Sequence, residues 1–284
     1  MKFISNEIHL DKFVLSTIAN GRYLGEISNM DRSFRQRFLK PWLSASERKR
    51  APSVPAGVRI YAIGDIHGRI DLLDSLLERI EKNLAASPIE RPIHIFLGDY
   101  IDRGPASREV LQRLIEHSRT HETICLRGNH ETFILRFLHD PAFLDDWRGW
   151  GGVPTLMSYG LAPSNRIDSA GLERLASALR QTMPDEHHHF LNNLPTTFVC
   201  GDYCFVHAGV RPGVPLAGQE EADLLWIRDE FLNATADFGK VIVHGHTPVP
   251  EADIRANRIN IDTGAYASGK LTCLIVEGEN LVLI

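Results

Sequence analysis

Acidic and histidine side chains recur next to glycines in five short segments of the chain, and these are side chains that bind divalent metals and transfer protons. One aspartate near one histidine is common in turns and helix caps, so a single segment would say little. Five in one chain need another explanation. The segments are residues 64–68 (GDIHG), 98–104 (GDYIDRG), 128–131 (GNHE), 206–209 (VHAG) and 243–248 (VHGHTP).

The segments that precede the first three loops have the pattern of strands, and helices follow the loops. Residues 58–63 are β-rich, and leucines then recur at helical spacing from Leu72 to Ile80. The same strand, loop and helix unit recurs with strands at 93–97 and 123–126. Ligands gather at the carboxyl ends of strands in open α/β sheets, because several loops converge there on a rigid support. The sequence therefore predicts a first sheet with the polar loops at one edge.

The second half of the chain has a different pattern. Beyond about residue 138 it predicts a mainly helical insert, punctuated by Trp, Gly and Pro, and after Leu194 short strands dominate. These strands predict a second sheet, and they are expected at 205–206, 241–243, 258–261 and 271–276.

Composition excludes several classes of protein. With 284 residues, 43% apolar and 24% charged, the chain is long enough for one large core. A net charge of −5 argues against a protein that coats nucleic acid or an anionic membrane. Without a membrane-spanning run or a signal peptide, a cytoplasmic protein is expected. The cysteines are read as reduced core residues, and they are Cys125, Cys200, Cys204 and Cys273.

The first 55 residues carry no chemical motif and are predicted to be an N-terminal extension and linker. Basic residues dominate from Arg32 to Arg50, which fits a solvated helical face better than a docking arm for an acidic partner. The catalytic domain is expected over residues 56–284.

The five segments in this order resemble the metallophosphoesterase superfamily and, within it, the phosphoprotein phosphatase family, over roughly residues 56–284. Residues 224–228 and 261–266 look like bacterial and phage-type serine/threonine phosphatases and their relatives that cleave diadenosine polyphosphates. The resemblance implies an α/β fold of the calcineurin-like type. That fold is a four-layer α/β/β/α sandwich with two central mixed sheets.

The resemblance also implies two metal ions bridged by one carboxylate, Asp99. Ligands without thiolates suit Mn, which is expected first, or Fe or Zn, and a shared carboxylate can keep two cations about 3.5–4 Å apart. A water between them would ionise near neutral pH and attack phosphorus. The first ion is expected on Asp65, His67 and Asp99, and the second on Asp99, Asn129, His207 and His246.

Further residues match positions that act on the substrate in the family. His130 would protonate the leaving group, with Asp102 as its partner, because a neighbouring carboxylate favours the imidazolium and orients the ring. Arg103 and Arg228 would bind phosphate oxygens, and Arg211 is a weaker third candidate.

Three functions remain open from the sequence. The first is a phosphoprotein phosphatase acting on phosphoserine, phosphothreonine or phosphotyrosine, whose partner would be a phosphorylated protein or peptide and neither nucleic acid nor membrane. The alternative is a hydrolase of dinucleotide polyphosphates, indicated by residues 151–160, which look like those relatives. The third is a catalytically silent module that binds phosphorylated partners.

Other segments imitate functional motifs. Residues 264–271 nearly spell a P-loop, but leucine replaces the metal-binding Ser/Thr and a strand is expected next. The run from His187 to His189 is expected on a solvated face, because neighbouring side chains cannot all face one ion. His244 is expected to support the ligand His246 rather than to bind metal itself.

Overall fold

The structure is a computed structural model that describes residues 50–164 and 166–284. Most of the predicted extension, including its basic stretch up to residue 49, lies outside the described residues. Residues Pro52–Ile284 form one unit. Within it the Ser53 N–H donates to Asp202 at 3.0 Å and the Val54 N–H to the Gly278 carbonyl at 3.0 Å. The last residues assigned to the linker therefore pack on the fold, and the assignment of the rest as an extension and linker stays a prediction.

The first sheet has five strands in the order β10-β9-β1-β2-β3. The strands β1, β2 and β3 are parallel, and two crossover helices connect them, as the repeated units in the sequence predict. Two antiparallel strands complete the sheet on the other side. One of them, β9, was expected in the second sheet from residues 271–276, and that expectation is wrong, because β9 pairs with β1. The elements are β1 (Val58–Ile63), α4 (Ile70–Ala86), β2 (Arg91–Phe96), α5 (Ser107–Ser118), β3 (Thr123–Cys125), β9 (Cys273–Glu277) and β10 (Asn280–Leu283).

The second sheet also has five strands, in the order β4-β5-β6-β8-β7. Its three central strands, β5, β6 and β8, are parallel, so their carboxyl ends lie at one edge. The strands are β4 (Thr197–Cys200), β5 (Tyr203–Val206), β6 (Val241–His244), β7 (Asp253–Ile254) and β8 (Arg258–Asn260). The short helices of this half are η4 (Leu216–Gly218), α11 (Glu221–Trp226), α12 (Asp229–Leu232) and α13 (Ala265–Ser268).

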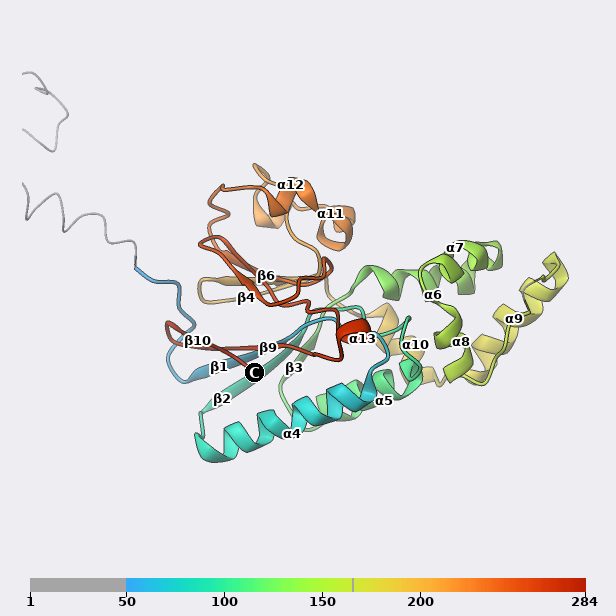
Figure 1. The fold of residues 1–284 in the computed structure, drawn as a ribbon, viewed down its shortest axis with the longest axis horizontal. Coiled ribbons are helices and arrows are strands. Elements are labelled where there is room, and N and C mark those ends of the chain that lie inside the picture. The colour runs from blue at the N-terminus through green and yellow to red at the C-terminus, as the bar shows by residue number, and fades with distance from the viewer. Residues whose placement is uncertain (1–49, 165) are drawn as a thin grey trace, which may run out of the picture. The chain divides into compact units, whose positions relative to one another are not determined.

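The two sheets pack face to face between helical layers (Figure 1). In β1, Ile60 and Ala62 pack in the core between the sheets, whereas Tyr61 and Ile63 pack with Leu73 of α4. Every residue of β1 is buried, because the strand has a packed layer on each face. On the far side, α11 and α12 cover the second sheet through a third apolar cluster. The predicted four-layer α/β/β/α sandwich with two mixed sheets is confirmed.

A helical insert lies between β3 and β4 in the chain and extends to one side in Figure 1. This agrees with the mainly helical segment predicted beyond residue 138. It contains α6 (Asn129–His139), η3 (Pro141–Phe143), α7 (Leu144–Gly149), α8 (Val153–Ser158), α9 (Ser169–Thr182) and α10 (Asp185–Asn192).

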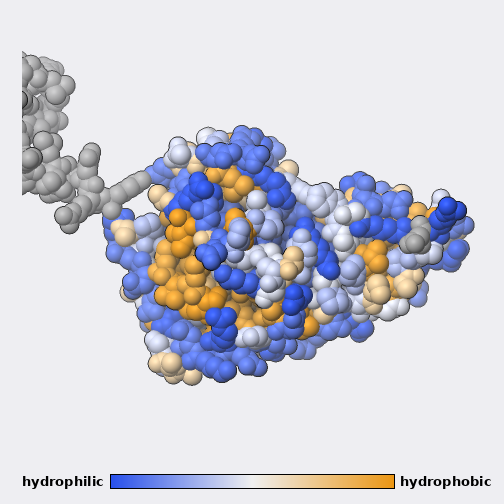
Figure 2. Space-filling model, in the orientation of Figure 1, coloured by the Kyte–Doolittle hydropathy of each residue, from blue (hydrophilic) through white to orange (hydrophobic). Residues whose placement is uncertain are grey.

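Apolar surface is visible in Figure 2 near β9 and β10, where the edge strand β10 leaves Val282 and Leu283 at 52% and 43% exposed. The four cysteines are free thiols, and three of them are buried; Cys200 is the partly exposed one. None of the helices in the described part of the chain is long and apolar enough to cross a bilayer.

The expectation that residues 187–189 share a solvated face is wrong for His187, which is fully buried. The Tyr159 hydroxyl donates to its Nδ1 at 2.7 Å, and its Nε2 donates to the Gln112 side chain at 3.0 Å. Tyr159 directly follows α8, and Gln112 lies on α5, which packs against both α8 and α10. Tertiary packing therefore places one histidine of the run inside, while His189 remains exposed.

Stability should fall on mild acidification, because the fold buries stacked neutral histidines. The Nδ1 of His94 lies 2.6 Å from the Nε2 of His117, and His121 stacks on both rings. Burial lowers the pKa of His94 from 6.5 to about 4 and that of His117 to about 3. Between pH 6.5 and about 4 the unfolded chain binds protons that the fold excludes, so stability present at pH 7.5 is lost as pH falls.

The measurement is urea unfolding at pH 7.5 and 5.5 of the wild type and of the double variant His94→Phe/His117→Leu. We expect the two histidines to account for about 1–3 kcal/mol of the difference between the pH values. The acid-induced loss should be smaller by this amount in the double variant, and equal pH dependence in both proteins would contradict the assignment.

Candidate metal centre

The polar loops predicted from the sequence meet at the carboxyl ends of both sheets. Loops after β1, β2 and β3 bring side chains from the first sheet, and loops after β5 and β6 bring two histidines from the second. All six predicted metal ligands are at most 5% exposed, and they are Asp65, His67, Asp99, Asn129, His207 and His246.

Asp99 lies between two groups of ligand atoms. In each group the atoms lie within 4.8 Å of one another, and the groups are His67, Asp99 and His130, and Asp99, His207 and His246. The two Asp99 oxygens point to different groups: Oδ2 is 3.5 Å from Nε2 of His67, and Oδ1 is 3.3 Å from Nε2 of His207. This is the position expected of a bridging carboxylate.

Lone pairs face each other in these groups, which is a repulsive arrangement without a cation. Nδ1 of His207 donates to the Leu97 carbonyl at 2.9 Å, so its Nε2 carries a lone pair in the neutral ring. That lone pair faces the amide oxygen of Asn129 at 2.8 Å. His67 repeats the pattern, because its Nδ1 donates to the Ile101 carbonyl at 2.8 Å and its Nε2 faces Asp99.

The electrostatics also fit bound cations. Burial lowers the pKa of His67 to about 3 and lowers that of His207, so both rings are neutral, as metal ligands must be. Burial, with the charges of Asp262 and Asp99, raises the pKa of Asp65, whose Oδ1 is buried and without a hydrogen-bond partner. A cation bound beside Asp65 would offset the free-energy cost of burying this carboxylate in its charged form. These residues therefore fit two divalent cations.

Backbone strain is concentrated in the same loops. The non-glycine residues of described segments that have positive φ are His67 (46°), Asp99 (53°), Asp102 (71°), Arg103 (66°) and His246 (66°). Left-handed conformations cost free energy for such residues and persist where surrounding structure imposes them, typically at functional sites. The glycines in these segments indicated the loops, but nothing in the sequence indicated positive φ angles at their non-glycine residues.

Gly245→Ala should damage this arrangement, because a methyl group there would overlap Oδ1 of Asp65. Displacing a metal ligand by a fraction of an ångström should lower metal affinity by about 10- to 100-fold. Isothermal titration with Mn²⁺ measures it. Gly149→Ala is the matched control, since nothing lies within 4 Å of a Cβ there. Equal Mn²⁺ affinity in both variants would contradict the close contact.

His130 lies between the carboxylate of Asp99 and the buried carboxylate of Asp102. Its Nδ1 donates to Oδ2 of Asp102 at 2.7 Å, and its Nε2 is 3.3 Å from the Arg103 guanidinium. Burial opposes a proton on His130, but the charges of Asp99 and Asp102 outweigh it and raise its pKa. The ring is therefore oriented and able to hold a proton.

Two residues that the sequence did not single out hold Asp102 in place. Trp147 donates to its Oδ2 at 2.9 Å, and the Thr155 hydroxyl donates to its Oδ1 at 2.6 Å. Both come from the helical insert, and the only signal was that Thr155 lies in the segment 151–160. Glu131, to which the sequence assigned no role, instead fixes the loops around Asp99: its carboxylate accepts the backbone N–H groups of Asp99, Tyr100 and Gly128 at 2.8–2.9 Å.

The three candidate phosphate-binding arginines differ in their surroundings. Arg103 lies over the Tyr266 ring at 4.7 Å, and Arg228 contacts the Thr247 hydroxyl at 3.1 Å. Arg211 is instead held by Asp223 at 2.7 Å and by Glu230 at 3.0 Å. Its charge is compensated there, so we leave Arg211 out of the proposed phosphate site.

The other motif-like segments lie as follows. His244 is buried, contacts Arg258 at 3.4 Å and belongs to neither ligand group. The P-loop-like segment forms the four-residue helix α13 and leads into β9.

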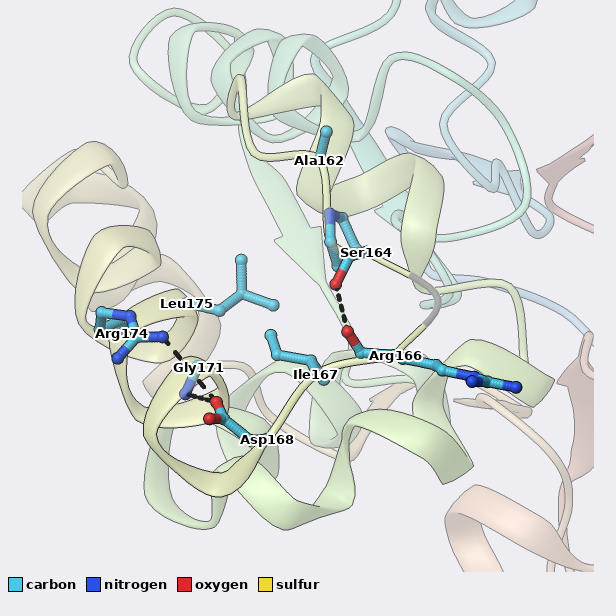
Figure 3. A pocket seen from close by; sticks show the side chains of 9 residues that line it. Ala162, Ser164, Arg166, Ile167, Asp168, Gly171, Arg174 and Leu175 are labelled. Carbon is cyan, nitrogen blue, oxygen red and sulfur yellow. Dashed lines mark hydrogen bonds and ion pairs between the residues drawn. The ribbon is translucent and has the colours of Figure 1, made fainter.

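A large hollow at the tip of the insert is separate from the metal centre. Its volume is about 800 Å³. At its wall the Asp168 carboxylate accepts the backbone N–H of Gly171 and forms an ion pair with Arg174 (Figure 3). None of the predicted ligands lines it. It therefore plays no part in the site described above.

Comparison with known proteins agrees with this geometry. The family model for calcineurin-like phosphoesterases matches residues 58–273. Bis(5'-nucleosyl)-tetraphosphatase PrpE of Bacillus cereus (strain B4264) is 30% identical over 237 residues, which cover 75% of this chain and 88% of that protein.

Solved structures share the fold. A proposed diadenosine tetraphosphatase superposes with a TM-score of 0.56 at 19% identity, covering 82% of this chain and 97% of that one. A variant of a cold-active protein tyrosine phosphatase gives 0.52 at 15% identity, covering 81% of this chain and 80% of that one. The chain therefore belongs to the calcineurin-like phosphoesterase family and is a phosphoester hydrolase.

Proposed function

We propose that the protein is a dimetal hydrolase that cleaves dinucleoside polyphosphates. The observation that carries the chemistry is the pair of buried ligand groups that share Asp99, one of which includes His130. The choice of substrate is supported by the relatives, whose names are those of bis(5'-nucleosyl)-tetraphosphatases. The sequence placed a phosphoprotein phosphatase first and this activity second, and the relatives favour the second.

The six predicted ligands would divide between two cations that share Asp99. Asp65, His67 and Asp99 would hold one cation, and Asn129, His207 and His246 would hold the other with Asp99. Mn²⁺ is our first choice of metal because the ligands are oxygen and imidazole. When bound, two such ions supply Lewis-acid charge and an ionised water near neutral pH.

The chain's own groups complete the reaction. Arg103 and Arg228 have no carboxylate partner in the described segments, so their guanidinium groups are available to phosphate oxygens. His130 gives its proton to the leaving oxygen as the phosphorus–oxygen bond breaks, and Asp102 keeps the ring in position. Water supplies the oxygen that stays on the new phosphate.

A competition experiment tests the substrate. Purified protein with Mn²⁺ receives diadenosine tetraphosphate and a phosphoserine peptide in one tube, and both products are followed by chromatography. We expect the dinucleotide to have the higher kcat/KM. A faster reaction of the phosphopeptide would overturn the substrate and restore the protein phosphatase, whereas binding without release of any product would indicate the catalytically silent module.

A further inference from the structure

Three aromatic side chains stand together beside the metal centre. The ring centroids of Phe133, Trp150 and Trp226 lie 5.6–6.0 Å apart, so each ring touches the other two. They come from α6, from the turn after α7 and from the end of α11. We call these three residues the aromatic wall.

One ring of the aromatic wall is buried, and the two indoles are partly exposed to solvent. Phe133 is 5% exposed, whereas Trp150 and Trp226 are 44% and 38% exposed. Phe133 is near-parallel to Trp150, at 29°, while the two indoles meet at 70°. Phe133 thus supports both indoles from behind and leaves indole surface open to a ligand.

The wall borders the reacting groups on two sides. Phe133 lies 5.1 Å and Trp150 6.5 Å from the His130 ring, and Trp226 lies 6.1 Å from the His246 ring. Because His130 would protonate the leaving group, the leaving part of the substrate must lie on this side of the centre.

Within the described part of the chain, exposed aromatic rings are found in this region only. The large aromatic residues exposed in the described segments are Trp150, Trp226 and Tyr266, and Tyr266 lies 5.5 Å from the His67 ring. Folding normally buries such rings, and an exposed cluster beside a group of buried polar side chains indicates a ligand surface.

Each indole is also close in the chain to a guanidinium group without a carboxylate partner in the described segments. Arg228 follows Trp226 by two residues. Gly151, next to Trp150, accepts the backbone N–H of Arg103 at 2.9 Å. A ligand that fits this pattern carries several negative charges joined to a flat ring.

We propose that Trp150 and Trp226 are specificity-determining residues that stack the nucleobase of a nucleoside polyphosphate on the leaving-group side of the centre. This proposal rests on the proposed function and adds that Trp150 and Trp226 recognise the nucleoside. Stacking accepts any base, because every base has a π face. The ring of a phosphotyrosine is the competing occupant, and the test separates the two.

The test compares inhibitors that differ only by the nucleoside. Adenosine diphosphate and pyrophosphate compete with p-nitrophenyl phosphate hydrolysis by the Mn²⁺-loaded protein. In the wild type, adenosine diphosphate should inhibit more strongly than pyrophosphate. In Trp226→Leu or Trp150→Leu this advantage should fall by about tenfold, with pyrophosphate inhibition unchanged.

Control variants separate stacking from simple loss of apolar surface. Trp226→Phe keeps a flat ring and should retain most of the advantage. Met157→Ala removes another exposed apolar side chain, at 60% exposure, and should change nothing. Equal weakening of both inhibitors in the leucine variants would overturn the proposal, as would a selective loss of inhibition by a phosphotyrosine peptide.

Tryptophan fluorescence of the wild type gives an answer that needs no variant and no turnover. Adenosine diphosphate should quench the emission at saturation, and pyrophosphate should not. Equal spectra with both ligands bound would contradict stacking. If instead the phosphopeptide wins the substrate competition while adenosine diphosphate still quenches, the substrate proposal fails and the nucleobase surface stands.

Discussion

Asp99→Asn should abolish tight binding of both metal ions and lower kcat/KM by at least about a thousand-fold. Each oxygen of Asp99 faces a different ligand group, and an amide offers only one oxygen and no charge to share between two cations. Losing the several kcal/mol of Lewis-acid stabilisation that metals supply corresponds to about three powers of ten or more in rate. Metal analysis and steady-state kinetics measure the two effects.

Asp145→Asn is the control for this variant, because the Asp145 side chain is 87% exposed on α7. It should keep both metals and full activity. Circular dichroism should show that Asp99→Asn is folded. Two tightly bound ions per chain in Asp99→Asn would remove Asp99 from its bridging role.

His130→Ala should keep the metals but lose turnover in proportion to the basicity of the leaving group. A positioned acid contributes about 10²- to 10⁴-fold to a rate, and most where the leaving oxygen is a strong base. We therefore expect a large fall for alkyl phosphates and a small one for p-nitrophenyl phosphate. His189→Ala, at an exposed position of α10, should leave both rates unchanged.

Equal losses on alkyl and aryl phosphates would contradict the acid role of His130. That outcome would indicate that the ring acts through its neighbours instead. Asp102→Asn would then be informative, because Asp102 also accepts hydrogen bonds from Trp147 and Thr155.

The sequence predicted the strand–loop–helix units and the meeting of their loops because these signals are local, whereas the four layers were implied by the resemblance. The apolar run of β1 and the leucine stripe of α4 are periodic patterns that read directly as strand and helix. Loops after parallel strands must share an edge, which brings Asp65 and Asp99 together whatever their separation in the chain.

Three edge strands, β4, β7 and β10, were missed for a physical reason. β4 and β10 have four residues each and β7 has only two, which is too short for an alternating pattern to stand out. Their identity as strands depends on hydrogen bonds to a neighbour, and no local pattern encodes that neighbour.

Contacts between residues that are distant in the chain could not be predicted from the sequence either. His187 is buried because Tyr159 and Gln112, which are distant in the chain, meet it between packed helices. Residues that hold others in place, such as Trp147 on Asp102, have no motif of their own. The aromatic wall likewise becomes visible only when three separated segments pack together.

The central claim is that the two buried ligand groups hold a pair of cations across Asp99. Anomalous X-ray scattering from crystals grown with Mn²⁺ tests it directly. We expect two peaks about 3.5–4 Å apart, one on the side of Asp65 and His67 and the other on the side of His207. A folded protein with no peak, or a single peak, beside Asp99 would contradict the claim.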